Sequence, residues 1–190
     1  MNPTLYIDLG SPYAYLAFER AASVFGAPPR LQPVLLGGIF RLRGWGSWSQ
    51  TARKEERKAE IEGRARSYGL PPVRWPLGWP PDGLAAMRAA TWAMNEGGLF
   101  EFARAVFRRQ FAEGLDMPPV DGLAEIATAA GLRGHELARA IEQPEIKDQL
   151  KSATAEAWED GVRGIPSVEV GGEIFFGDDQ LEVAARTMTG

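Results

Sequence analysis

The chain has 190 residues, of which 45% are apolar and 24% charged, and these values are typical of a soluble globular protein with one domain. Its net charge is −4, and its apolar runs are far shorter than the roughly 18 residues of a membrane span. We therefore expect neither nucleic acid nor a membrane as a partner. The first residues show no basic or apolar region typical of a signal peptide, so we expect a cytoplasmic protein.

The absence of cysteine excludes several kinds of chemistry for this chain. Without a thiol, the chain forms no disulfide and no thiolate metal site, and it performs no dithiol redox chemistry of its own. Any sulfur chemistry must therefore use a small molecule. His135 is the single histidine, and we interpret it as a structural or surface residue and expect no metal site.

The first part of the chain predicts a strand, a helix and a second strand. Residues 5–9 are a short apolar segment typical of a buried strand. Ser11 then offers an N-cap oxygen and Pro12 suits the first helical position, which predicts a helix over residues 13–25. Residues 31–36 follow as a second strand, and a parallel pair with a right-handed crossover is the expected arrangement.

The middle of the chain predicts helices. Residues 51–68 are expected to form a charged helix, and the proline-rich residues 71–82 an extended linker. Amphipathic patterns then predict five further helices, over residues 84–95, 99–112, 122–130, 134–142 and 144–160. We therefore predict a helical insertion over residues 45–150, within a domain made of residues 1–44 and 151–190.

The last part returns to strands. Strands are predicted over residues 167–170 and 173–176, on either side of the tight turn Gly171-Gly172, and a final helix over residues 180–188. The element order is β-α-β, a helical insertion, then α-β-β-α. This order predicts an α/β, thioredoxin-like fold with an inserted all-helical domain.

Two positions in the chain, Ser11 and the Ile165-Pro166 bond, are candidate parts of a ligand site. Ser11 lies where a strand gives way to a helix, so a thiolate bound there would gain a hydroxyl hydrogen bond and the partial positive charge of the helix end. The alternative is that Ser11 only caps the helix. The Ile165-Pro166 bond belongs either to a plain loop before a strand or to a cis turn, beside which Ile165 pairs its main chain with a peptide-like ligand.

Charged and aromatic residues add further candidates. The two aspartates of the loop 177–179 either cap the last helix or accept the α-ammonium group of a ligand. Arg41 is either a surface residue or a bidentate partner of a ligand carboxylate. Trp45 and Trp48 belong either to the core or to an aromatic pocket.

Four segments together carry a resemblance to a known family. They are Asp8-x-x-Ser11-Pro12-Tyr13, residues 33–40, Gly164-Ile165-Pro166-Ser167 and residues 171–179. In this order they resemble the 2-hydroxychromene-2-carboxylate isomerase family, which belongs with the kappa-class glutathione transferases in the DsbA-like branch of the thioredoxin superfamily. The resemblance runs from the first strand to the last helix.

The resemblance implies a glutathione-dependent isomerase of an aromatic carboxylate, acting in the degradation of aromatic compounds. It assigns glutathione binding to five residues: Ser11, Ile165, Gly177, Asp178 and Asp179. Ser11 would also be catalytic, because it would hydrogen-bond the sulfur that adds to the substrate. Arg41 would contact the substrate carboxylate. Members of this family are often dimers, so the resemblance also allows a homodimer.

Two other functions stay open. A kappa-like glutathione transferase or peroxidase would use the same thiolate but release it as a conjugate or an oxidised product. A non-catalytic protein that binds a thiol is the third interpretation, because a thioredoxin-like scaffold does not by itself imply activity.

Overall fold

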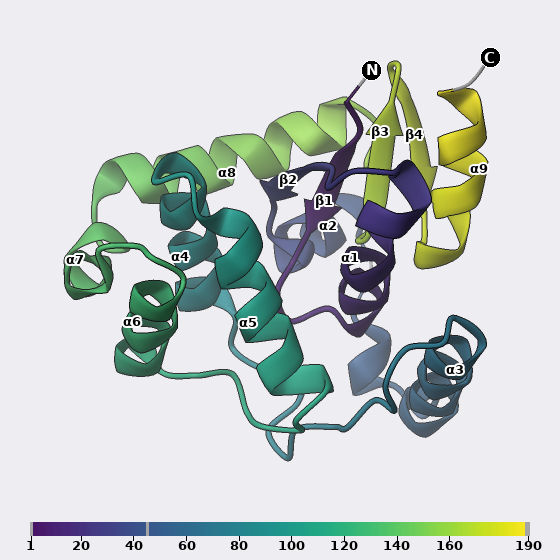
Figure 1. Cartoon of the computed structure of the whole chain (residues 1–190), viewed down its shortest axis with the longest axis horizontal. Coiled ribbons are helices and arrows are strands. Elements are labelled where there is room, and N and C mark those ends of the chain that lie inside the picture. Colours follow the sequence, from purple (N-terminus) through teal and green to yellow (C-terminus); the bar gives the residue numbers. More distant parts are fainter. Residues whose placement is uncertain (1, 45, 189–190) are drawn as a thin grey trace.

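A four-stranded mixed sheet forms the centre of one half of the molecule (Figure 1). The computed structural model describes residues 2–44 and 46–188. The strand order is β2-β1-β3-β4, with β1 parallel to β2 and antiparallel to β3, and β3 antiparallel to β4. The strands are β1 Thr4–Ile7, β2 Arg30–Pro33, β3 Ser167–Val170 and β4 Glu173–Phe176. The expected parallel pair and the expected hairpin are both confirmed.

Local sequence rules account for the helix between the two parallel strands. The helix α1 spans Pro12–Phe25, and the Ser11 side chain accepts a hydrogen bond from the Ala14 N–H at 3.2 Å, as an N-cap does. The helix ends at Gly26, which has a left-handed backbone with φ of 77° that glycine adopts at no steric cost. The predicted helix and its cap are therefore confirmed.

The predicted ends of the first two strands were wrong. The strand β1 ends at Ile7, and the N–H of Leu9 points instead to the sulfur of Met87 at 3.1 Å. The strand β2 ends at Pro33, which has no N–H to donate, and Leu36 opens an unpredicted helix, α2 Leu36–Arg43. No side chain next to α2 in the sequence caps it. The Asp8 carboxylate does so from 28 residues away by accepting the Leu36 N–H at 2.8 Å.

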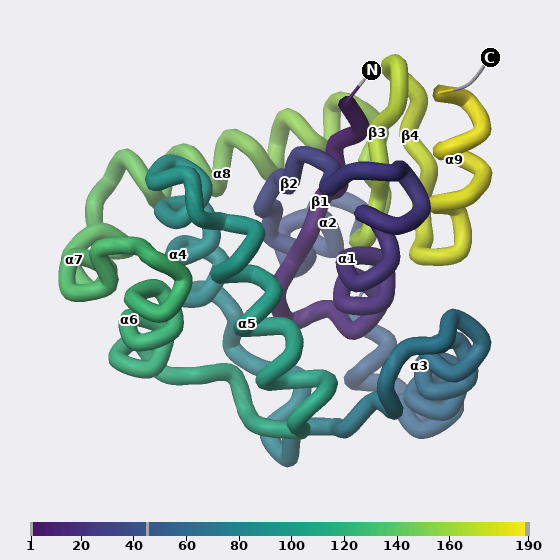
Figure 2. The backbone as a smooth tube through the Cα atoms, in the orientation of Figure 1, coloured from purple at the N-terminus to yellow at the C-terminus, as the bar shows by residue number. Residues whose placement is uncertain are grey.

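The predicted helices of the middle region are present with small shifts at their ends. They are α3 Lys54–Ser67, α4 Leu84–Asn95, α5 Leu99–Phe111, α6 Val120–Ala129, α7 Gly134–Ala140 and α8 Pro144–Glu159. A short 3-10 turn, η1 Trp48–Gln50, precedes α3; another, η2 Asp178–Gln180, precedes the last helix, α9 Leu181–Thr187. Figure 2 shows α8 running from the group formed by α4 to α7 toward the sheet, while α3 lies apart from that group.

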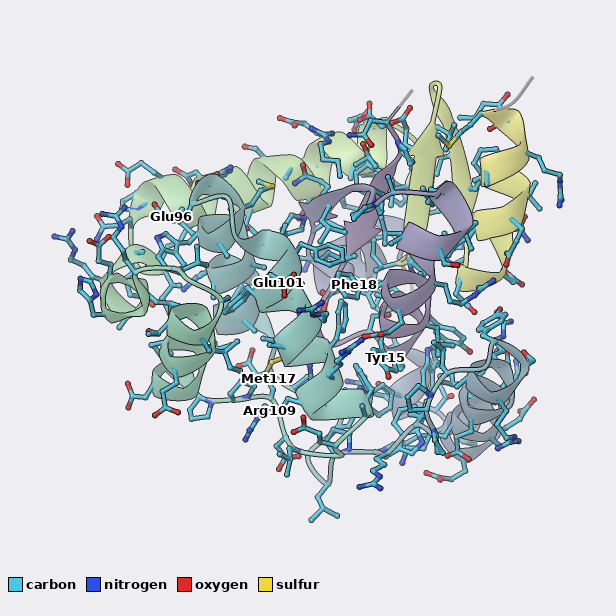
Figure 3. The ribbon with its side chains drawn as sticks, viewed as in Figure 1. Tyr15, Phe18, Glu96, Glu101, Arg109 and Met117 are labelled. Carbon is cyan, nitrogen blue, oxygen red and sulfur yellow. The ribbon has the colours of Figure 1, made fainter. Side chains whose placement is uncertain are left out.

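The helices and the sheet share one hydrophobic core. Tyr15 and Phe18 of α1 lie against α5 (Figure 3), where their rings are 5.5 Å from Phe111 and 5.4 Å from Phe107, centroid to centroid. Packing of this kind holds the helical region in one position relative to the sheet. In the described part of the chain, no helix is both long and apolar enough to cross a membrane.

Candidate functional site

A cavity of about 780 Å³ opens where β1 ends and the helices α1 and α2 begin. Its wall is formed by the β1–α1 loop, α2, η1, α3, the proline-rich linker, the loop before β3 and η2. All five residues expected to bind glutathione line it: Ser11, Ile165, Gly177, Asp178 and Asp179. The fold therefore brings together in one cavity residues from both ends of the chain.

Ser11 lies on the cavity wall at the start of α1. Its side-chain oxygen accepts the Ala14 N–H, and in residues 2–44 and 46–188 nothing accepts its hydroxyl hydrogen. Pro12 has no N–H, and the N–H of Tyr13 has no acceptor among the described residues either. A hydroxyl donor and a helix amide at the positive end of α1 are thus available to a ligand.

Three distant side chains hold the loop before Ser11. The Leu9 N–H donates to Met87, and the Leu9 carbonyl accepts from the Gln110 amide at 2.8 Å. The indole N–H of Trp79 donates to the Gly10 carbonyl at 3.1 Å. Since these residues come from α4, α5 and the linker, the helical region positions Ser11.

Ile165 lines the same cavity as Ser11 and lies at the entry to β3. The Ile165-Pro166 bond is cis, which the second of the two interpretations requires. The pairing of the Ile165 main chain with a ligand stays a prediction. Neighbouring polar groups are paired: the Gly177 N–H donates to the Pro166 carbonyl at 3.0 Å and the Ser167 hydroxyl to the Gly164 carbonyl at 2.8 Å. The N–H and C=O of Ile165 have no hydrogen-bond partner in the described part of the chain, and Ile165 lines the cavity.

The two aspartates of η2 differ in their surroundings. The Asp178 side chain is buried and accepts from the Arg64 guanidinium at 2.8 Å and from the Tyr68 hydroxyl at 2.9 Å. Burial raises the pKa of Asp178, although the Arg64 charge and the Tyr68 hydroxyl act against that rise. The Asp179 side chain is about half exposed, at 51%, and lies 3.5 Å from Arg64. Asp178 therefore holds α3 against this loop, and Asp179 offers the more accessible carboxylate.

Asp8 is a cavity residue to which the sequence analysis gave no role of its own. Its two carboxylate oxygens accept the Gly10 N–H at 2.9 Å and the Leu36 N–H at 2.8 Å, so it joins the loop before Ser11 to the start of α2. Burial raises the pKa of Asp8, while the two backbone hydrogen bonds act in the opposite direction. A single carboxylate at the end of an apolar strand was the signal that could have found it.

Arg41 is exposed and does not line the cavity. The residues of α2 that do are Leu36, Gly37, Phe40 and Arg43, which share one helical face. Arg41 therefore lies outside the part of α2 that forms the cavity wall, and its side chain is exposed to solvent. Arg43 occupies the position toward the cavity, and its guanidinium donates to the Arg163 carbonyl at 2.8 Å.

Aromatic rings form another part of the wall. Trp48 and Trp79 both line the cavity, with ring centroids 5.0 Å apart, and Tyr13 lies 6.2 Å from Trp48. Trp48 therefore belongs to the pocket rather than only to the core. Trp45 lies outside the described residues. A flat apolar ring would find stacking partners here.

A mixed sheet with a helix start facing a cis-proline loop defines the thioredoxin-like class. The chain belongs to the family of DSBA-like thioredoxin domains, which matches residues 4–189. This match confirms the expected thioredoxin-like fold with its helical insertion.

Individual relatives agree with this assignment. The chain is 26% identical over 201 residues to glutathione S-transferase kappa 1 of Homo sapiens, covering 97% of this chain and 89% of that protein. It is 28% identical over 186 residues to 2-hydroxychromene-2-carboxylate isomerase of Sphingobium xenophagum, covering 93% and 92%. A solved structure of 2-hydroxychromene-2-carboxylate isomerase superimposes with a TM-score of 0.87 at 20% identity, covering 100% of this chain and 95% of that one. The chain is thus related both to a kappa-class glutathione transferase and to a 2-hydroxychromene-2-carboxylate isomerase.

Proposed function

We propose that this protein is a glutathione-dependent isomerase of an aromatic carboxylate of the 2-hydroxychromene-2-carboxylate type, active in aromatic degradation. The observation that carries the proposal is the placement of the Ser11 hydroxyl and the start of α1 on the wall of a cavity that also exposes the main chain of Ile165. Similarity to an isomerase and to a kappa-class transferase supports the same class of cofactor.

The free polar groups of the cavity fit glutathione. The Ser11 hydroxyl and the Tyr13 N–H are donors for a sulfur anion, and the Ile165 N–H and C=O are partners for the extended cysteinyl residue. Asp179 is a partner for an α-ammonium group. The cavity volume of about 780 Å³ lies in the range of small-molecule sites and leaves room for a second ligand beside the tripeptide.

When bound, glutathione supplies a thiolate that adds to the conjugated ring of the substrate and leaves again after the ring has opened and a bond has rotated. Ser11 donates a hydrogen bond that keeps the sulfur anionic, and the positive end of α1 acts in the same direction. Ser11 is not the nucleophile in this proposal. Without cysteine, the chain offers no thiol that could trap the cofactor as a disulfide.

The rest of the wall suits an aromatic acid. Trp48, Trp79 and Phe40 present apolar rings to a planar substrate. Arg43, rather than Arg41, would hold the substrate carboxylate, because it is on the cavity face of α2. With Ser11 on one part of the wall and these aromatic side chains on another, the chain's own residues would orient a bound substrate relative to the cofactor thiol.

The test is an assay of the purified protein with 2-hydroxychromene-2-carboxylate and glutathione, in which substrate conversion and free thiol are measured together. An isomerase converts the substrate while the thiol concentration stays constant. Similarity to the human kappa-class enzyme supports a second candidate, a glutathione transferase, which would consume one thiol for each molecule of a chlorinated nitrobenzene. No conversion of either substrate would contradict both candidates.

A further inference from the structure

The first turn of α2 leaves two backbone N–H groups without a partner. The first N–H groups of a helix find no acceptor within it, so each needs one from elsewhere. The Leu36 N–H has the Asp8 carboxylate, at 2.8 Å. The N–H groups of the next two residues, Gly37 and Gly38, have no acceptor in the described part of the chain. The positive end of α2 therefore presents two donors.

Of these two glycines, only Gly37 lines the cavity. Packing requires a glycine at position 38, because a Cβ atom there would lie 2.9 Å from the methyl carbon of Thr154. At Gly37, φ is not positive, and no atom from another part of the described chain lies within 4 Å of the place of a Cβ atom. Glycine weakens a helix relative to alanine, and a side chain here would point toward the helix start. Glycine at position 37 therefore keeps the space beside its own N–H open.

A buried hydroxyl on the same cavity wall is the second feature that points to a ligand. Ser11 is only 3% exposed, and its hydroxyl hydrogen has no acceptor among the residues that the structure describes. The Asp8 carboxylate accepts one N–H from the loop before Ser11 and one from the start of α2, so it fixes these two segments relative to each other. The cavity thus offers a ligand two donors on joined segments, the Ser11 hydroxyl and the Gly37 N–H.

We infer that the Gly37 N–H is a catalytic group that donates a hydrogen bond to a keto oxygen of the substrate. The inference rests on the proposed function, because opening of the hemiketal ring of a 2-hydroxychromene-2-carboxylate gives a keto group conjugated with a C=C bond.

The chemistry of this bond explains why a donor is needed there. Nucleophilic addition to a conjugated C=C bond forms one C–S bond and shifts the π electrons, so the former double bond becomes single and can rotate. The keto oxygen then carries the negative charge, and departure of the nucleophile reverses both changes without an oxidant or a reductant. A fixed backbone donor at the positive end of α2 stabilises this oxygen, as the donors of an oxyanion hole do.

Ligand binding in the absence of a thiol tests the donor separately from catalysis. Benzylidenepyruvate carries the keto group and the conjugated double bond, whereas styrylacetate has a CH2 group in place of the keto group. In NMR spectra of the full chain, the Gly37 amide proton should move downfield with benzylidenepyruvate and clearly less with styrylacetate. By calorimetry, the keto ligand should bind roughly three- to tenfold more tightly, which is the usual gain from one hydrogen bond.

Two substitutions separate the donor from the space beside it. Gly37→Pro removes the N–H, and proline is tolerated in the first turn of a helix, where no intrahelical hydrogen bond is lost. This variant should lose the preference for the keto ligand and lower kcat by roughly 100-fold. Gly37→Ala keeps the N–H and adds a methyl group to the cavity wall. It should weaken both ligands alike, keep the preference, and raise Tm by roughly 1–4 °C.

Gly63→Ala is the matched control. Gly63 lies within α3 and does not line the cavity, and the nearest atom to a Cβ atom there would be a terminal nitrogen of Arg66, at 3.9 Å. This variant should raise Tm as Gly37→Ala does and leave both affinities and kcat unchanged.

The outcomes separate the inference from the proposed function. The inference is overturned if the Gly37 amide proton responds equally to both ligands, if Gly37→Pro keeps the preference, or if neither ligand binds. Isomerase activity of the unaltered protein would leave the proposed function standing in each of these cases, and its absence would contradict both. If Gly37→Pro does not fold, the NMR result on the unaltered protein decides.

Discussion

Replacement of Ser11 by alanine removes a hydroxyl that has two separable roles. As the N-cap of α1, its oxygen accepts the Ala14 N–H at 3.2 Å, and loss of such a cap costs about 1 kcal/mol. For a chain of this length, that loss corresponds to a fall of roughly 2–4 °C in Tm. The second role is donation of its hydrogen to a bound thiolate.

The expected catalytic loss is larger than the loss of stability. Removal of one hydrogen-bond donor that stabilises an anion in an active site typically lowers kcat by about 100-fold, which is equivalent to about 2.7 kcal/mol. The same hydrogen bond should depress the thiol pKa of bound glutathione. Its loss should therefore raise that pKa by roughly one to two units, which is the equivalent of 1.5–3 kcal/mol.

Three measurements separate these effects. Steady-state kinetics give kcat, the ultraviolet absorbance of the thiolate as a function of pH gives the pKa of bound glutathione, and thermal unfolding gives the loss of the cap. Ser152→Ala, at an exposed position of α8, is the matched control and should leave all three unchanged. A Ser11→Ala protein with full kcat and an unchanged thiol pKa would refute the role assigned to Ser11 and leave only its capping role.

Three further predictions follow from the walls of the cavity. Arg43→Ala should raise KM for a carboxylate substrate by roughly 10-fold, whereas Arg41→Ala, on the outer face of the same helix, should not change it; equal effects would contradict the assignment. Trp79→Phe should destabilise the fold by about 1 kcal/mol and lower kcat, because it removes the indole donor to the loop before Ser11. Trp75→Phe should leave kcat unchanged, since the Trp75 indole donates to α3 instead. The folded-state pKa of Asp8 lies above its ordinary value of 3.8, so the native state binds the proton more tightly than the unfolded state. The quantity to measure is the free energy of unfolding of the natural protein minus that of Asp8→Asn, obtained in denaturant at several pH values. This difference should be highest below pH about 4 and fall as pH rises through the raised pKa. A difference that grows with pH would contradict this sign.

The geometry also explains why a chain without cysteine keeps a thioredoxin-like cavity. The starts of α1 and α2 face the same space, and Asp8 joins them by accepting one N–H from each side. This arrangement leaves backbone donors and one hydroxyl at the cavity, and none of them depends on a protein thiol. The proposed role of Ser11 therefore needs no sulfur of the protein's own.

The amino-acid sequence by itself determined the elements whose rules are local. Ser11 and Pro12 specify the start of α1, because they satisfy or remove the orphan N–H groups of its first turn. Gly171 and Gly172, both with positive φ, specify the hairpin that joins β3 to β4. Apolar residues at helical spacing located the helices of the middle region, although their ends shifted by a few residues.

The tertiary structure alone decided the features that depend on distant partners. The helix α2 was missed because its cap, Asp8, comes from another element. Its first residue, Leu36, also stood at the end of a short apolar segment, residues 31–36, that resembled a strand. With α2 unseen, nothing in the sequence distinguished Arg41 from Arg43. Asp178 and Asp179 look alike in the sequence, and only the packing of Arg64 and Tyr68, more than 100 residues away, buries one carboxylate and leaves the other open. Local sequence patterns indicate the backbone conformation that a segment prefers. The exposure and charge of a site residue depend instead on neighbours that come close only when the chain folds.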